Sequence, residues 1–266
     1  MKKLIALVLM SIAGAGICVA AGGVKKKRMP PYDYGKVVIA NFSAKAGLSP
    51  VRFDHWSHRA RYSCRVCHID IGFAMQAGAT QIKASDNANG YYCGTCHNGR
   101  TTHEGKKVFT ACERTVTDEN RGRCAVCHRE GDATDRADAF YSFAEKMPRE
   151  RLGNGINWEK AEAEGLIKPV TRLEGISPRA SSLPIQKDFA LTAKVQGMPE
   201  IVFSHKKHTV WNGCEFCHPE IFVGVKKGMT KYSMVEIFEG KYCGVCHDKV
   251  AFPQSDCQRC HTKPVS

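Results

Sequence analysis

The chain has 266 residues, 14 cysteines, 11 histidines and a formal net charge of +13 at pH 7. Cysteine at this frequency suits a disulfide-stapled secreted domain or a zinc protein, and the positive charge suits a nucleic-acid-binding protein. The spacing of the cysteines along the chain argues against all three classes.

The N-terminus predicts a secretory signal peptide over residues 1–21. Lys2 and Lys3 form a positively charged start, and residues 4–19 form an apolar run that is too short to span a bilayer comfortably. Cleavage after Ala20 or Ala21 would release a protein into the periplasm, or onto the outer surface of the cell.

Two other interpretations of this segment are less favourable. A lipid anchor on Cys18 needs a small residue just before the cysteine, and Ile17 is large. An uncleaved membrane anchor would leave the basic run at residues 25–28 on the outer side, against the positive-inside rule.

Six Cys-x-x-Cys-His sequences follow, and each is the attachment sequence of a c-type haem. The two thiols form thioethers with the porphyrin vinyl groups, and the histidine ligates the iron from the proximal side. A disulfide scaffold has no reason to place a histidine after every second cysteine, and a zinc protein uses two such pairs per metal without a fixed histidine. The sequence therefore predicts six covalently bound haem c groups, held by Cys64, Cys67 and His68; Cys93, Cys96 and His97; Cys124, Cys127 and His128; Cys214, Cys217 and His218; Cys243, Cys246 and His247; and Cys257, Cys260 and His261.

The haems also account for the charge. Loss of Lys2 and Lys3 with the signal peptide lowers the formal charge from +13 to +11, and each haem brings two propionates. We expect the basic side chains to balance these carboxylates and to keep the surface soluble, and we expect no nucleic-acid partner.

The motifs form two groups of three, separated by the 85 residues between His128 and Cys214. Each group opens with Phe-x-His-x-x-His, at residues 53–58 and 203–208, and the middle motifs at 92–97 and 242–247 share Tyr-Cys-Gly-x-Cys-His. This internal repeat predicts a first triheme module over residues 22–129, a connector over 130–200 and a second triheme module over 201–266.

The two groups resemble c7-type triheme cytochrome domains, a branch of the cytochrome c3 family, over about residues 53–128 and 203–261. The resemblance implies a mostly irregular chain with short α-helices, in which the haems form the core. The sequence agrees, because it lacks long strand or amphipathic-helix patterns and offers only about 41 residues per haem, too few for an ordinary hydrophobic core.

The connector has local helical signals. Apolar spacing predicts one helix over residues 135–147, ended by Pro148, and a second over residues 157–166, stopped near Pro169. Residues 177–182 are expected to form a loop. We expect the connector to wrap on the haem modules, and it contains no catalytic constellation.

Five histidines remain after the proximal ligands, and all lie inside the two modules. The family resemblance implies that His55 and His58 ligate the haems of His68 and His97, and that His205 and His208 ligate those of His218 and His247. It also implies that Met234 ligates the haem of His261; simple packing of Met234, or ligation by Met229, is the alternative. Methionine ligation raises a haem potential, so this haem would be an electron sink in its module.

The third haem of the first module has no clear distal ligand, because Ala84 stands where the second module has Met234. His103 is our candidate ligand for the haem of His128, with Met75 or a five-coordinate iron as alternatives. Cys112, which lies in the longer spacing between His97 and Cys124, is interpreted as a buried inert thiol.

Iron with two strong axial ligands has no position open for a substrate and can only exchange electrons. We therefore expect an electron carrier, not an enzyme, that passes electrons between a quinol-oxidising membrane complex and outward acceptors such as metal oxides, or outer-membrane or other periplasmic cytochromes. A multihaem reductase would need a five-coordinate haem, for which the haem of His128 is the candidate. A haem-filament subunit would need a histidine from the next chain, and the histidine count nearly suffices without one.

Overall fold

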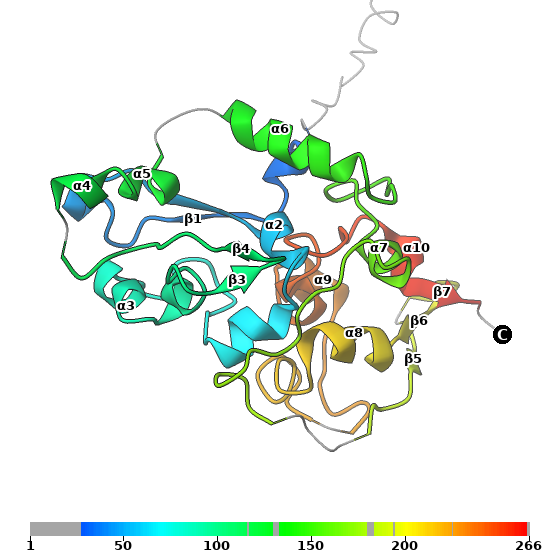
Figure 1. The fold of residues 1–266 in the computed structure, drawn as a ribbon. Helices are drawn as coiled ribbons and strands as arrows, with labels where there is room; N and C mark the ends of the chain where they lie inside the picture. The colour runs from blue at the N-terminus through cyan, green and yellow to red at the C-terminus, as the bar shows by residue number, and fades with distance from the viewer. Residues whose placement is uncertain are drawn as a thin grey trace, which may run out of the picture.

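The computed structural model describes residues 28–115, 117–129, 133–179, 184–193, 195–224 and 226–264. Short helices and small antiparallel sheets are joined by long irregular segments, as Figure 1 shows. The fold is therefore mostly irregular with short helices, as predicted. The predicted signal peptide lies outside the described residues, and within the described ranges no helix has the length and apolar character needed to cross a membrane.

The first repeat begins with a two-stranded hairpin, β1 paired with β2, in which Val37 lies opposite Phe53. Strand β2 runs directly into helix α2, so the hairpin fixes the position of His55 and His58, the first two expected distal ligands. The elements of this repeat are η1 (Pro31–Asp33), β1 (Lys36–Ile39), η2 (Ala44–Ala46), β2 (Val51–Asp54), α2 (His55–Arg59), η3 (Val66–Asp70), α3 (Ala84–Ala88), η4 (Tyr92–Thr95), β3 (Thr102–His103), β4 (Lys106–Lys107), α4 (Asp118–Arg121) and α5 (Cys124–Cys127).

The connector forms helices α6 (Ala133–Ala144) and α7 (Trp158–Ala163), where the apolar spacing predicts them. Helix α7 starts at its cap, since the Asn157 side chain accepts a hydrogen bond from the backbone N–H of Lys160.

The connector also builds a small apolar core that the haem-only core expected from the sequence does not include. Phe140 of α6, Trp158 and Ala161 of α7, and Ile156 and Ile167 are buried together. Trp56 of α2 packs against this cluster, so the connector is anchored on the first repeat, and Figure 1 shows α6 above α2. We define these five buried residues as the connector core.

The second repeat consists of β5 (Phe189–Leu191), β6 (Glu200–Phe203), α8 (His205–Asn212), α9 (Met234–Phe238), η5 (Tyr242–Val245), α10 (Cys257–Cys260) and β7 (His261–Lys263). Its three strands form one sheet in the order β5-β6-β7, with Phe189 opposite Phe203. Strand β5 falls in the range expected to be connector, so the sheet of this repeat begins upstream of the expected boundary at residue 201.

Several elements correspond between the two repeats. Helices α3 and α9 begin at Ala84 and Met234, an offset of 150 residues, and η4 and η5 keep the same offset. A Cβ added at Gly244 would lie 1.9 Å from the carbonyl oxygen of Ile237 in α9. A Cβ added at Gly94 would clash in the same way with the carbonyl oxygen of Asn87 in the first repeat. Only glycine allows the middle motif to approach the preceding helix this closely.

The repeats contact each other through their first haem motifs. Arg65 of the first motif binds Asp70 at 2.8 Å and reaches Glu215 of the second repeat at 3.4 Å. The buried ring of Phe216 packs edge-on against the His68 ring, with 5.8 Å between centroids. The first haem sites of the two repeats are therefore neighbours.

Candidate haem-binding sites

Each motif occupies a short helical turn. The backbone N–H groups of His97 and His128 donate to the carbonyls of the first cysteine of their motifs, both at 2.8 Å, and those of His218 and His247 do so at 3.1 and 3.0 Å. Residues three and four positions apart share one face of such a turn. The local fold therefore places both thiols and the following imidazole side by side.

The thiols are suited to thioether formation. The thirteen described cysteines are all free of disulfides. Burial raises the pKa of Cys67 and Cys246 to about 12, and that of Cys93, Cys217 and Cys243 to about 11. These sulfur atoms are uncharged at neutral pH and lie in the apolar surroundings that an attached porphyrin edge requires.

Three expected distal–proximal pairs face each other. The ring centroids of His55 and His68 lie 6.4 Å apart with planes only 4° from parallel. Those of His58 and His97 lie 6.3 Å apart, and those of His208 and His247 lie 6.4 Å apart.

This spacing fits an iron atom between the rings. A metal–imidazole bond is about 2 Å long, so two nitrogens on opposite sides of one metal are about 4 Å apart and their ring centroids about 6 Å apart. The residues present therefore fit bis-histidine haem at these three sites.

Hydrogen bonds through Nδ1 orient most of the imidazoles. In nine histidines Nδ1 donates to a backbone carbonyl, which leaves Nε2 for the iron. The pairs are His55 with Gly35, His58 with Asp54, His68 with Phe73, His128 with Ser49, His205 with Lys187, His208 with Ser204, His218 with Phe222, His247 with Phe252 and His261 with Pro199. Five of these partners lie four or five residues from their histidine, whereas the partners of His55, His128, His205 and His261 lie 18 to 79 residues away and are brought close only by the fold.

Burial also keeps the ligands uncharged. It lowers the pKa of His58 to about 4, and it lowers the pKa of His55, His68, His97, His208 and His247 in the same direction. A neutral imidazole has the free lone pair that iron needs.

One phenylalanine supports both distal histidines in each repeat. Phe53 lies 4.9 Å from His55 and 4.3 Å from His58 between ring centroids. Phe203 repeats this arrangement with His205 and His208 at 5.1 and 4.5 Å. The Phe-x-His-x-x-His pattern was visible in the sequence, and the structure shows that its phenylalanine positions the ligands.

The other expected ligands are placed less directly. In the described part of the chain, His205 and His218 do not make the close ring approach of the three pairs, although Nδ1 of each is held by a carbonyl. Met234 is the first residue of α9 and is 40% exposed, whereas Met229 is 66% exposed. Ligation by these residues remains a prediction.

The distal side of the His128 haem is the least defined. His103 lies in β3 with its ring 6.0 Å from Tyr62, and the pKa of Tyr62 is raised by burial and by neighbouring Cys96. The structure thus places His103 near the middle haem site of the first repeat. Met75 is 36% exposed, and a choice among these ligands remains a prediction.

Cys112 lies between the middle and third haem sites of the first repeat. Its sulfur is 3.9 Å from the side-chain nitrogen of Asn87, and burial raises its pKa. Its surroundings therefore agree with a neutral packing role.

Comparison with known proteins identifies the family of this chain. The family model described as "Cytochrome c7 and related cytochrome c" matches residues 51–129 and 201–262. A solved c7-type three-heme cytochrome domain is 32% identical and is covered over 99% of its length by 30% of this chain, with a TM-score of 0.27. The C-terminal hexaheme fragment of a dodecaheme cytochrome c is 23% identical, with 88% of this chain and 99% of that chain covered and a TM-score of 0.26. No curated protein matches the chain.

Proposed function

Since the chain belongs to the family of cytochrome c7 and related cytochromes c, we propose that it is a periplasmic hexahaem electron carrier. Several covalently bound haems follow from the family and the cysteine motifs, and six is the number of complete motifs. The observation that carries the proposal is the facing of paired imidazoles at 6.3–6.4 Å, because an iron held on both sides exchanges electrons and takes no substrate.

The bound haem supplies one-electron chemistry. The chain attaches it through paired cysteines, orients the imidazoles through backbone carbonyls, and holds both axial positions. Contact of Phe216 with His68 brings the first sites of the two repeats together, which supports movement of electrons between modules.

The proposed donors and acceptors are other redox proteins. We place the carrier between a quinol-oxidising membrane complex and outward acceptors, either metal oxides or outer-membrane and periplasmic cytochromes. The apolar N-terminal segment with Lys2 and Lys3 supports export, and covalent haem attachment outside the cytoplasm agrees with it.

Two measurements on the purified protein test this proposal. The intact mass should exceed that of the processed chain by six haems, and the ferric spectrum should show low-spin haem only. A mass with four or fewer haems would contradict the hexahaem assignment. A high-spin ferric signal from a haem that also binds small substrates would instead favour the reductase, with the His128 haem as its site.

The His55→Ala variant is the positive control for this spectrum. Loss of the His55 imidazole removes one ligand of the best-defined pair, so one high-spin haem should appear. The His103→Ala variant tests the uncertain ligand by the same signal at the haem of His128.

A further inference from the structure

Arg59 lies where the first repeat, the connector and the second repeat meet. Its guanidinium carbon is 4.9 Å from the ring centroid of Trp158 in α7 and 5.4 Å from that of Trp211 in α8. Its Nη1 donates to the carbonyl of Val250 at 3.2 Å. Two cation–π contacts and one hydrogen bond hold this positive charge in a fixed position.

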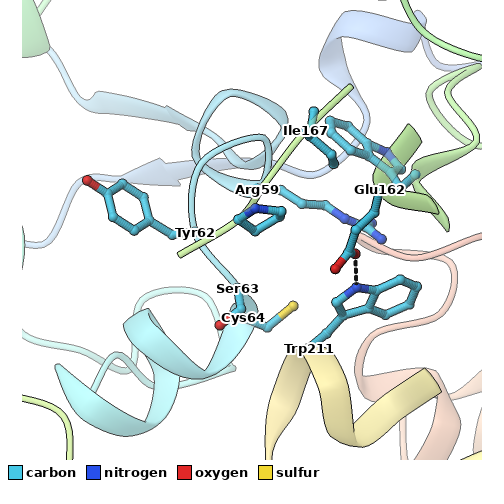
Figure 2. A pocket seen from close by; sticks show the side chains of 9 residues that line it. Arg59, Tyr62, Ser63, Cys64, Glu162, Ile167 and Trp211 are labelled. Carbon is cyan, nitrogen blue, oxygen red and sulfur yellow. Dashed lines mark hydrogen bonds between the residues drawn. The ribbon is translucent and has the colours of Figure 1, made fainter. Parts of the chain in front are cut away.

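A negative charge lies at the same junction. The carboxylate of Glu162 accepts a hydrogen bond from Nε1 of Trp211 at 2.5 Å. Arg59, Glu162 and Trp211 line one small pocket together with Cys64, and Figure 2 shows the Cys64 thiol beside them. Cys64 is the first attachment cysteine of the haem ligated by His68, so both charges lie at the edge of that haem.

We propose that Arg59 and Glu162 are a pair of opposed charges that sets the reduction potential of the haem attached at Cys64. The inference rests on the proposed electron-transfer function and adds the residues that tune one carrier in the chain. Arg59 acts through its charge on the haem, and it touches neither axial ligand in this role.

The sign of each effect follows from the electron balance. Reduction of ferric haem adds one electron and lowers the charge of the group by one. A nearby positive charge therefore stabilises the ferrous form and raises the potential, and a negative charge lowers it.

Arg59 and Glu162 differ in which haem sites they lie near. Arg59 also reaches the second repeat, where its Nη1 donates to the carbonyl of Val250, four residues after Cys246. Glu162 lies in the pocket beside Cys64. The haem of His68 should thus respond to both charges, and the haem of His247 more weakly to Arg59.

The repeats are asymmetric at this position. The residue equivalent to Arg59 in the second repeat, 150 positions later, is the uncharged Thr209. The first repeat therefore has a positive charge at this position that the second repeat lacks, and Arg59 should raise the potential of the His68 haem against the opposing effect of Glu162.

An NMR-monitored redox titration of the full holoprotein, with haem signals assigned individually, tests the proposal. Arg59→Met keeps an apolar side chain between the tryptophans but removes the charge, and should lower the potential of the His68 haem and, by less, that of the His247 haem. Glu162→Gln keeps an oxygen acceptor for Trp211 and should raise the potential of the His68 haem. The haems of His128 and His261 should not shift with either variant.

Two controls separate charge from packing. Arg59→Lys should retain the wild-type potential. Lys160→Met removes the same charge from a side chain that is 60% exposed on α7, and solvent and salt should screen its effect. Equal shifts in all haems, an unchanged His68 haem in both charge variants, or the same shift in Arg59→Lys as in Arg59→Met would overturn the inference. Haem content measured first by mass distinguishes this failure from failure of the hexahaem assignment.

Discussion

Tyr34 shows how one side chain links the repeats. Its hydroxyl donates to the carbonyl of Ala251 at 2.5 Å, across the boundary between the modules. Burial and the negative charge of Asp248 raise the pKa of Tyr34 from 10.0 to about 12, partly opposed by Arg59. The neutral phenol is therefore the form that the folded protein prefers.

This shift predicts a loss of stability at high pH. In the unfolded chain the tyrosine releases its proton near pH 10, whereas the folded protein keeps it until about pH 12. Unfolding then releases a proton, so this contribution is complete below pH 10 and decreases as the pH rises towards 12. Tyr34→Phe should cost about 1 kcal/mol at neutral pH for the lost hydrogen bond and should flatten this alkaline slope.

Urea unfolding between pH 7 and 11.5, followed by circular dichroism, measures both effects. Tyr91→Phe is the control, because Tyr91 is 65% exposed and should leave the slope as in the wild type. An alkaline slope that is the same in Tyr34→Phe and wild type would refute this account.

Met234 gives a second prediction at the scale of one residue. If it ligates the haem of His261, Met234→Ala should create one high-spin ferric haem that binds carbon monoxide when reduced, and Met234→His should keep six low-spin haems and lower one potential. Met229→Ala is the matched control and should change neither. If Met234→Ala leaves the spectrum unchanged, Met234 only packs, and Met229 becomes the candidate.

At the scale of elements, those with local determinants were predictable from the sequence. Helix α7 begins at the Asn157 cap and α6 follows the apolar spacing before Pro148, so both helices lie where the sequence placed them. Strand β5 was missed because its three residues acquire strand structure from pairing with β6. The connector core was also missed, since its packing against Trp56 depends on a distant helix.

The candidate sites divide in the same way. The facing of His55 with His68 was implied by the resemblance to c7-type triheme domains. The spacing alone does not determine it, because the described rings of His205 and His218, at the same spacing, do not approach each other in this way. The environment of His103 was not, since its neighbour Tyr62 lies about forty positions upstream and only the fold brings them together. His103 has no counterpart in the second repeat, so the internal repeat could not be used to predict its partner.

Gly244 offers a test of the contact between η5 and α9. Gly244→Ala would place a Cβ against the backbone carbonyl of Ile237, which cannot rotate away. We expect a loss of about 1–3 kcal/mol from this overpacking, seen as a lower melting temperature with reduced haem content at Cys243 and Cys246. Gly122→Ala is the control, because its φ is −59° and nothing lies within 4 Å of the added Cβ. Equal melting temperatures for both variants would exclude the close approach.

At the scale of the whole molecule, each repeat contains the histidines that we expect to be its own distal ligands, and the connector has no histidine. The contacts between the repeats include Arg65 with Glu215, Phe216 with His68 and Tyr34 with Ala251. This organisation predicts that the second repeat can bind its haems alone, provided that its complete sheet is present.

The position of β5 decides which fragment does so. Phe189 pairs with Phe203, and the carbonyl of Lys187 holds Nδ1 of His205, so a fragment of residues 200–266 lacks both a strand and the support of a distal ligand. A fragment of residues 184–266 retains them and should carry three haems per chain with a cooperative melting transition. The shorter fragment should be haem-poor or should aggregate through the unpaired edge of β6.

Expression of both fragments with the same export signal, followed by intact mass and a redox titration, makes the comparison. Full loading of the 200–266 fragment would show that β5 is dispensable, and poor loading of both would show that the second repeat requires the junction with α7 and the first repeat.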